Sequence, residues 1–252
     1  MNHFLKVALA TAASSLRGWQ GLMAKPAPVQ PVEPLKLFEY EGCPFCRLVR
    51  EVLTELSLNA QIFPCPKGGE RFRPQAVALS GKAQFPLLVD DNTGVVMTES
   101  ADIIAYLYQT YGQQPVPLRW KASAPQVLSS FANSALSLGA GVRARASNAP
   151  AQMLTLYSFE ASPFCKPVRE LLCELELPYN LVNLGKEQFA DMGVNGMHAA
   201  LGEYNPVQGG KRAQFMAKTN RMMVPYLEDP NTGKAMFESK DIVSYLLSTY
   251  AR

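Results

Sequence analysis

The alternation of apolar and polar positions predicts an α/β unit in the first half of the chain. A short apolar run is followed by a segment in which Val49, Val52 and Leu53 fall on one face of a helix. Farther on, the turn-forming residues Asn92 and Gly94 separate two short apolar runs, which is typical of a hairpin. The expected elements are strands at 35–40, 60–63, 87–90 and 95–98 and helices at 44–56 and 100–111. Because a short βαβ connection is right-handed, the first two strands should be parallel.

The same pattern occurs a second time in the chain. Residues 35–46 match residues 154–165 at an offset of 119, and the match continues through the next helix. Residues 86–94 match 225–233 at an offset of 139, so the second copy carries 20 additional residues before this segment. We therefore expect two tandem domains, the first at 1–112 and the second at 127–252, joined by a linker at 113–126 that contains prolines.

Each domain is expected to begin with an amphipathic helix. In the first domain, one helical face is predicted to hold Leu5, Ala8, Leu9, Ala12, Ala13, Leu16 and Trp19. The counterparts of Leu9, Ala12 and Ala13 in the second domain are Leu128, Phe131 and Ala132. A retained helix is favoured because Lys6 interrupts the apolar run and no basic cluster precedes it. A signal or transit peptide remains the alternative, since Ala10-Thr11-Ala12 resembles a cleavage site.

Composition narrows the class of protein. With 252 residues, of which 48% are hydrophobic, the chain can bury a sizeable core. A net charge of +3 gives no indication of nucleic-acid or anionic-membrane binding. No apolar run reaches the roughly 18 to 20 residues that a membrane span requires. The five cysteines are few and odd in number, which suits a reducing compartment, and we expect a cytoplasmic protein.

The segment Cys43-Pro44-Phe45-Cys46 stands where the first strand turns into a helix. Unpaired N–H groups and the helix dipole favour an anion there, so the thiolate of Cys43 should form below the ordinary thiol pKa of roughly 8.5. Pro44 suits the first helical turn, because its missing N–H costs no hydrogen bond. Cys46 lies one turn away, within reach to form or resolve a disulfide. We expect Cys43 to be a nucleophile and Cys46 its resolving partner.

Two other roles were weighed for this pair of cysteines. A zinc site needs four ligands, and the only histidines, His3 and His198, are far from the pair in sequence, so no metal is expected. A structural disulfide is the other alternative. Cys65, between two prolines, has no partner that the sequence identifies.

The order of these elements resembles the thioredoxin fold of glutaredoxins and of the glutathione S-transferase N-terminal domain. Cys43-Pro44-Phe45-Cys46 is close to the C-P-Y-C of dithiol glutaredoxins, and the resemblance covers both copies. It implies an α/β chain of two tandem thioredoxin-like domains, each with a mixed four-stranded sheet and flanking helices. In true transferases an all-helical domain follows, whereas here the second copy takes that place.

The resemblance implies glutathione as a co-substrate of the first domain. It assigns the backbone of Phe85 to the cysteinyl part of glutathione, with a cis bond before Pro86. It assigns Glu99 and Ser100 to the γ-glutamyl group, and the chemistry agrees, since a carboxylate suits an ammonium and a hydroxyl at a helix start suits a carboxylate. A plain helix N-cap is the alternative for these two residues. The basic residues before Pro86 either receive the glycine carboxylate or form a solvated loop: Lys67, Arg71, Arg73 and Lys82.

In the second domain Ser162 replaces the first cysteine, which puts redox chemistry there in doubt. This serine resembles the transferase hydroxyl that binds the glutathione thiolate, or it caps the helix before Pro163. The remaining candidates in this domain are Cys165, Val224, Pro225, Glu238 and Ser239. The domain either binds glutathione or is a degenerate copy that packs on the first. The glycine-rich segment 187–221 is expected to be a flexible loop that covers either site.

The leading hypothesis is a glutathione-dependent thiol–disulfide oxidoreductase that acts on a disulfide or a glutathionylated thiol through Cys43 and Cys46. One alternative is a glutathione transferase or isomerase activity. The other is a non-catalytic protein that binds glutathione or a protein partner through its tandem domains.

Overall fold

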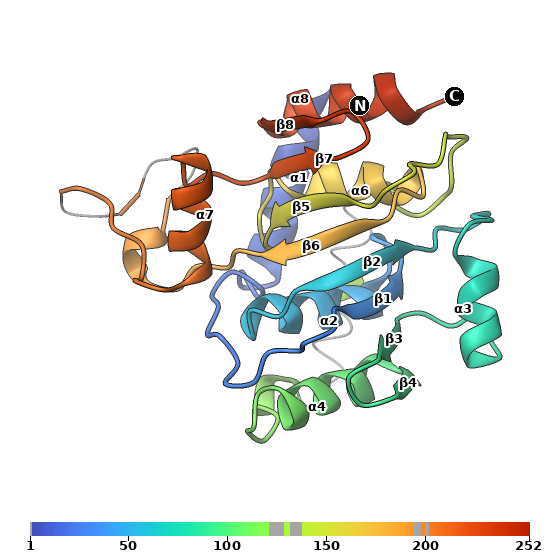
Figure 1. The fold of residues 1–252 in the computed structure, drawn as a ribbon, viewed down its shortest axis with the longest axis horizontal. Coiled ribbons are helices and arrows are strands. Elements are labelled where there is room, and N and C mark those ends of the chain that lie inside the picture. Colours follow the sequence, from blue (N-terminus) through green and yellow to red (C-terminus); the bar gives the residue numbers. More distant parts are fainter. Residues whose placement is uncertain (1, 121–128, 132–137, 194–197, 200–201) are drawn as a thin grey trace.

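The computed structural model describes residues 2–120, 129–131, 138–193, 198–199 and 202–252 (Figure 1). In the first half the elements are α1 (His3–Leu16), β1 (Leu35–Glu39), α2 (Pro44–Glu55), β2 (Ala60–Pro64), α3 (Arg73–Ser80), β3 (Leu87–Asp90), β4 (Val95–Thr98), α4 (Ser100–Thr110) and the short 3₁₀ helix η1 (Leu118–Trp120). In the second half they are β5 (Leu154–Ser158), α6 (Lys166–Glu174), β6 (Tyr179–Asn183), the 3₁₀ helix η2 (Phe189–Asp191), α7 (Lys211–Thr219), β7 (Tyr226–Asp229), β8 (Lys234–Phe237) and α8 (Ser239–Tyr250). None of the described helices is both long enough and apolar enough to cross a membrane.

All eight strands form a single mixed sheet, in the order β4-β3-β1-β2-β6-β5-β7-β8. The expected α/β class and the parallel β1–β2 pair are confirmed. The two four-stranded sheets join edge to edge, because β2 pairs antiparallel with β6. Gln61 lies opposite Asn180, its own counterpart at the offset of 119, so a local two-fold axis relates the two halves at this point. Each half therefore pairs a sheet edge that would otherwise be exposed.

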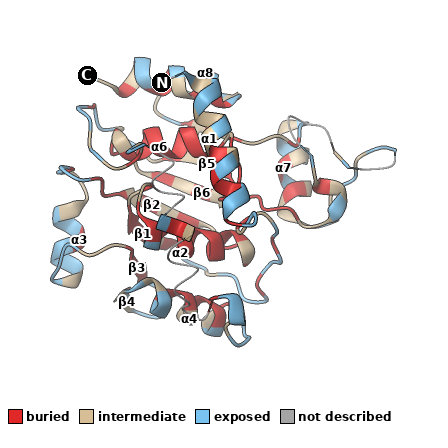
Figure 2. Cartoon of the chain, turned by 180° about the vertical axis from the view of Figure 1, so that it is seen from behind, coloured by how far each residue is buried: buried red, intermediate tan, exposed pale blue. Residues whose placement is uncertain are grey.

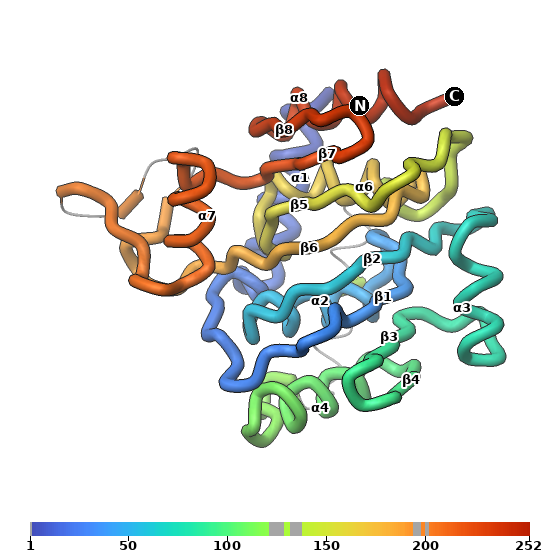
Figure 3. Tube along the Cα trace, viewed as in Figure 1, coloured from blue at the N-terminus to red at the C-terminus, as the bar shows by residue number. Residues whose placement is uncertain are grey.

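Helices cover both faces of this sheet (Figures 1 and 3). On one face, apolar residues of α2 and α6, such as Val49 and Val168, belong to one buried cluster that extends through both halves. Figure 2 shows this buried band along α2 and α6. On the other face, Phe38 belongs to a smaller cluster with Ala76 of α3, and Leu184 to one with Phe215 of α7.

The structure corrects the expectation that 187–221 is a flexible loop. Helix α7 (Lys211–Thr219) and η2 lie within that range, and α3 is the counterpart of α7 in the first half. The glycines that suggested a loop include Gly209 and Gly210, which immediately precede α7 and do not interrupt it. The linker 113–126 beyond Trp120 and most of the helix expected to open the second domain, with Leu128 and Ala132, lie outside the described residues.

Helix α1 is confirmed, but its predicted buried face is wrong. Its buried residues are Ala10, Ala13 and Ser14, whereas Leu5 and Leu16 are 48% and 61% exposed. The helix packs on α6 of the second half (Figure 3), and Ser14 Oγ donates a hydrogen bond to Ala161 O at 2.9 Å. Small side chains allow this close approach, which apolar periodicity alone does not reveal.

Two arginines and two glutamates form a buried ionic cluster between the halves. Arg50 Nε lies 2.9 Å from Glu160 Oε2 of the second half, and Arg169 Nη2 lies 3.1 Å from Glu41 Oε1 of the first. Each arginine also contacts the other glutamate, both at 3.2 Å. All four side chains are about 1% exposed. Since Arg169 is the counterpart of Arg50 and Glu160 that of Glu41, the cluster follows the same two-fold relation as the sheet.

The neighbouring charges hold the cluster in its ionised form. Burial alone would raise the pKa of Glu160, but the positive charges of Arg169 and Arg50 lower it to about 2. Because this folded-state pKa lies below the ordinary value of 4.5, the carboxylate stabilises the fold fully above pH 4.5 and progressively less as the pH falls toward 2.

We expect Arg169→Met to destabilise the chain by about 3 to 5 kcal/mol, because the substitution leaves Glu41 buried without its bidentate partner. Urea unfolding followed by circular dichroism measures this change. The matched control is Lys36→Met, which removes an ion pair with Asp91 whose side chains are 36% and 47% exposed and should cost less than about 1 kcal/mol. Equal losses in the two variants would contradict the role given to the cluster.

Candidate active site

Cys43 occupies the N-cap of α2, with extended backbone angles of φ −78° and ψ 123°. Its Sγ accepts a hydrogen bond from the backbone N–H of Cys46 at 3.3 Å. Pro44 takes the first helical position, as the sequence predicted. The strand, the turn and the helix therefore aim otherwise unpaired N–H groups at this sulfur.

The two thiols of the motif have opposite pKa shifts. A hydrogen bond from the Cys46 side chain lowers the pKa of Cys43 to about 7; burial opposes this shift, and the backbone N–H groups of Cys46 and Phe45 support it. Burial raises the pKa of Cys46 well above its ordinary value, and the interaction with Cys43 adds to that rise. At neutral pH the thiolate is therefore favoured on Cys43 over Cys46.

Cys43 is also closely covered, with only 2% of the residue exposed. Its Sγ lies 3.9 Å from Phe85 O. Residues from the expected start of the second domain contact the two residues that follow Cys43, since Ser130 Oγ donates to Pro44 O at 2.6 Å and the rings of Phe131 and Phe45 meet edge to face at 5.6 Å. The C-x-x-C motif therefore contacts a segment from outside its own βαβ unit.

The residues assigned to glutathione follow one another around this sulfur. The Phe85–Pro86 bond is cis, as the resemblance implied. The neighbouring Gln84 donates a hydrogen bond to the carboxylate of Glu99, which caps α4 with a φ of +73°. Ser100 begins α4 and is partly exposed. Cys43, the cis-proline turn and the start of α4 therefore form one connected set of polar groups.

The second half repeats part of this framework with different chemistry. Its helix begins later, because α6 starts at Lys166 with Cys165 at the N-cap, so the expected alternative of Ser162 as the cap before Pro163 is wrong. Ser162 Oγ accepts a hydrogen bond from Cys165 N at 3.3 Å, so it takes the place of the Cys43 sulfur. Cys165 is fully buried, and burial raises its pKa. The Val224–Pro225 bond is cis, and Glu238 caps α8 with a φ of +68°. Ser239 differs from Ser100, because it is only 3% exposed.

The basic residues before Pro86 separate into different roles. Arg71 donates to Leu175 O and Ser147 O at 2.9 and 2.5 Å, so it binds the second half. Arg73 donates to Cys65 O at 2.8 Å and lies over the Phe85 ring, 4.8 Å from its centroid. Lys67 and Lys82 are exposed. Arg73 alone of these four therefore contacts the candidate site.

Cys65 is fully buried, and burial raises its pKa, which disfavours its reactive thiolate form.

Glu39 is a residue of the site that the sequence did not identify. Burial raises the pKa of Glu39 to about 8, and its charge in turn contributes to the raised pKa of Cys46. A glutamate in an otherwise apolar strand, where the second copy has Ser158, was the available signal.

This arrangement defines a thioredoxin-like α/β fold with a thiol site at a helix N-terminus. The chain belongs to the family of the glutathione S-transferase N-terminal domain, whose family model matches residues 37–115 and 156–252, one segment in each half. The resemblance drawn from the sequence is thereby confirmed.

Similar solved structures are glutathione transferases and a related protein. A Bombyx mori glutathione transferase in complex with GTT is 27% identical over 37% of this chain and 45% of its own, with a TM-score of 0.29. Ure2p in complex with S-p-nitrobenzylglutathione is 28% identical over 44% of this chain and 48% of its own, with a TM-score of 0.30. The match therefore spans less than half the length of either protein. A comparison with curated proteins gave no match.

We expect alkylation of Cys43 by iodoacetamide to follow a titration with a midpoint near pH 7, because only the thiolate reacts. Cys46→Ala should move this midpoint upward, since it removes the side chain whose hydrogen bond lowers the pKa of Cys43. Cys46→Ser, which keeps a donor, should move it less. Mass spectrometry of the alkylated peptide measures the profile, and Cys65→Ala serves as a control that should leave it unchanged.

Proposed function

We propose that the chain is a glutathione-dependent thiol–disulfide oxidoreductase whose nucleophile is Cys43. The observation that carries this proposal is the opposed pair of thiol pKa values at the start of α2, about 7 for Cys43 and strongly raised for Cys46. A thiol with a pKa near the ambient pH combines a sizeable thiolate fraction with good nucleophilicity. All five cysteines are free, which suits such an enzyme in a reducing compartment such as the cytoplasm.

Glutathione is proposed to bind along the set of groups that leads from Cys43 to α4. The backbone of Phe85 lies beside the sulfur and suits the cysteinyl part of the tripeptide. The exposed carboxylate of Glu99 suits the γ-glutamyl ammonium, and Ser100 with the N–H groups that open α4 suits the γ-glutamyl carboxylate. In this proposal the two halves act as one packed unit, because Ser130, from the expected start of the second domain, bonds to Pro44 O next to Cys43.

The reaction begins when the Cys43 thiolate attacks the glutathionyl sulfur of a mixed disulfide. A bond forms between Cys43 and glutathione, the original S–S bond breaks, and the released thiolate takes a proton from water. A second glutathione thiolate then attacks the glutathionyl sulfur on Cys43, which yields glutathione disulfide and restores the Cys43 thiolate. One mixed disulfide and one glutathione thus become one thiol and one glutathione disulfide.

Glutathione, rather than Cys46, is proposed to complete this cycle. The raised pKa of Cys46 leaves little thiolate at neutral pH, and the residue is fully buried. The role of Cys46 is then to stabilise the Cys43 thiolate through its hydrogen bonds. Because Cys43 is itself only 2% exposed, the favoured substrates are small disulfides rather than disulfides on folded proteins.

We expect Cys43→Ser to abolish glutathione-coupled reduction of the mixed disulfide of glutathione and 2-mercaptoethanol, because no other thiol of the chain combines a lowered pKa with a helix start. Cys46→Ser should retain most of the activity, and Cys65→Ala should equal the parent. The readout is oxidation of NADPH by glutathione reductase added to the assay.

Undiminished turnover by Cys43→Ser would overturn the proposal. A parent chain that conjugates an aromatic electrophile to glutathione but reduces no disulfide would support the transferase alternative. A parent chain that binds glutathione in calorimetry and catalyses neither reaction would support a binding protein.

A further inference from the structure

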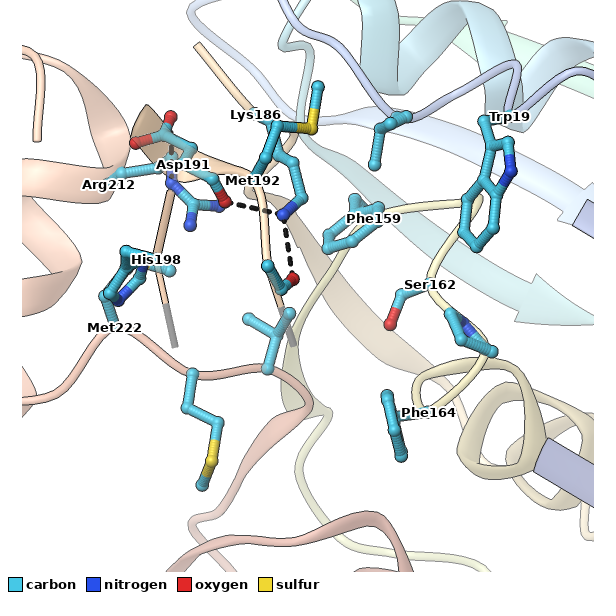
Figure 4. A pocket seen from close by; sticks show the side chains of 15 residues that line it. Trp19, Phe159, Ser162, Phe164, Lys186, Asp191, Met192, His198, Arg212 and Met222 are labelled. Atoms are coloured by element: carbon cyan, nitrogen blue, oxygen red, sulfur yellow. Dashed lines mark hydrogen bonds and ion pairs between the residues drawn. The ribbon is translucent and has the colours of Figure 1, made fainter. Parts of the chain in front are cut away.

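The second half contains a cavity that the chemistry of Cys43 does not use (Figure 4). Its volume is about 270 Å³. Ser162 lies in its wall, with Oγ directed inward (Figure 4), and Val224 of the cis-proline turn is another of the lining residues. Because the volume lies just below the roughly 300 to 1,000 Å³ that is usual for ligand sites, a fitting occupant must be compact.

Six of the fifteen lining residues are tryptophan, phenylalanine or methionine. They come from four parts of the chain, namely the segment after α1, the turn before α6, the segment before α7 and the segment after it. The main contributors are Trp19, Phe159, Phe164, Met192, Met222 and Met223. Flat aromatic rings and adaptable methionines favour an occupant with an apolar, preferably aromatic body.

Two cations line this cavity, Lys186 and Arg212, and of these two only Arg212 has a carboxylate partner among the described residues. Lys186 is 6% exposed, and its ammonium donates to Asp191 O and Gly193 O at 2.5 and 3.1 Å. These acceptors are uncharged carbonyls, and within the described residues no carboxylate forms an ion pair with Lys186. The nearby Asp191 carboxylate is already held by Arg212 at 3.2 Å and by Tyr204 at 2.8 Å. The described wall therefore carries an excess positive charge and a donor without an anionic partner.

The burial of Lys186 is specific to the second half, because its counterpart in the first half is exposed. Lys186 is the counterpart of Lys67 at the offset of 119, and both lysines bond through their backbone to a segment from outside their own βαβ unit. Lys67 is exposed, whereas η2 and Met192, which follow Lys186 in the insertion, close over it. Burial and the charge of Arg212 lower the pKa of Lys186 to about 8, a cost that an anionic ligand would offset.

We infer that the second half binds a compact aromatic carboxylate in this cavity, with the carboxylate on Lys186 and Ser162 and the ring among the aromatic and methionine side chains. The inference does not depend on the proposed activity of Cys43. Glutathione fits the cavity poorly, because its peptide groups would lie against apolar side chains and Ser239, the counterpart of Ser100, is buried.

The test is titration calorimetry of the full chain at pH 7 with 2-naphthoate and with its neutral analogue 2-naphthylmethanol. The parent chain should bind the carboxylate at least about tenfold more tightly than the alcohol. Lys186→Met should weaken 2-naphthoate binding by at least about tenfold and change binding of the alcohol less than about twofold. The matched control, Lys67→Met, should leave both unchanged.

A second variant tests the same cavity in case Lys186→Met does not fold. Val224→Phe places the residue of the first half, Phe85, at the same cis-proline turn and should block both probes while Lys186 stays in place. Affinity for 2-naphthoate should also fall as the pH rises through about 8, because Lys186 loses its proton there, while the lowered pKa values of Asp191 and His198 place their titrations at lower pH. Arg212, the other charged group beside Lys186, pairs with Asp191.

Absence of heat with millimolar 2-naphthoate, or equal losses in Lys186→Met and Lys67→Met, would overturn the inference. Displacement of 2-naphthoate by glutathione in a Cys43→Ser background would also overturn it, since the cavity would then be a glutathione site. Unchanged 2-naphthoate binding in the Cys43→Ser variant alone would support a site separate from the thiol chemistry.

Discussion

The structure depends on the buried pairing of Arg50 with Glu160 and of Arg169 with Glu41. Charges at about 1% exposure are tolerated only when each one has a partner of opposite sign and good geometry. Here each half supplies a partner to the other in addition to the pairs within each half, so separation of the halves would break two of the four ion pairs. The paired edge strands β2 and β6 and the apolar cluster that extends through both halves lie around this point. Duplication within one chain therefore produced an interface with the self-complementary character of a symmetric dimer.

The same cluster is linked to the thiol site. Arg50 also pairs with Glu39, the strand residue whose charge contributes to the raised pKa of Cys46, and the positive charge of Arg50 contributes to the lowered pKa of Cys43. The electrostatics of the C-x-x-C motif are thus set partly by an arginine whose other partner, Glu160, belongs to the second half. An isolated first half would lack that carboxylate, so Arg50 and Glu39 would face a different balance of charge. Through Glu39 and Arg50, the packing of the two halves therefore influences the pKa values of Cys43 and Cys46.

Local patterns were sufficient to predict most of the fold. The apolar runs of β1 and β3, the helical face of α2 and the Asn-Gly turn are properties of short segments, and the repeat doubled every such observation. The packing of α1 on the second half was not predictable, because its buried residues Ala10, Ala13 and Ser14 have helical spacing but are too small to distinguish their face from the one that holds Leu5 and Leu16. The pairing of the edge strands β2 and β6 was also not predictable, since the sequence of neither strand indicates which strand it pairs with. Helix α7 was not predicted, because the glycines that precede it favour a loop and its own nine residues are too few to outweigh them.

Some features of the candidate site were likewise predictable from the local sequence, whereas others depend on contacts with distant residues. The position of Cys43 follows from adjacent residues, whereas the cis-proline turn was implied by the family resemblance, and the structure contains both. The contacts that Ser130 and Phe131 make with Pro44 and Phe45 have no counterpart in the local sequence, and the burial of Lys186 comes from an insertion whose sequence gives no sign of what it covers. Such contacts depend on tertiary placement, which a single sequence does not specify.

Duplication also explains how two unlike sites share one framework. At three equivalent positions the halves differ, with Cys43 against Ser162, Phe85 against Val224 and exposed Lys67 against buried Lys186. The first two changes remove a thiol and a ring next to the helix start, which leaves space beside the serine hydroxyl. The insertion then closes that space and buries a charge within it. A buried ammonium is costly unless something anionic meets it, so its presence is hard to explain as a remnant of a lost thiol site. The second half is therefore better explained as a copy whose site acquired a different ligand than as a copy that lost its function.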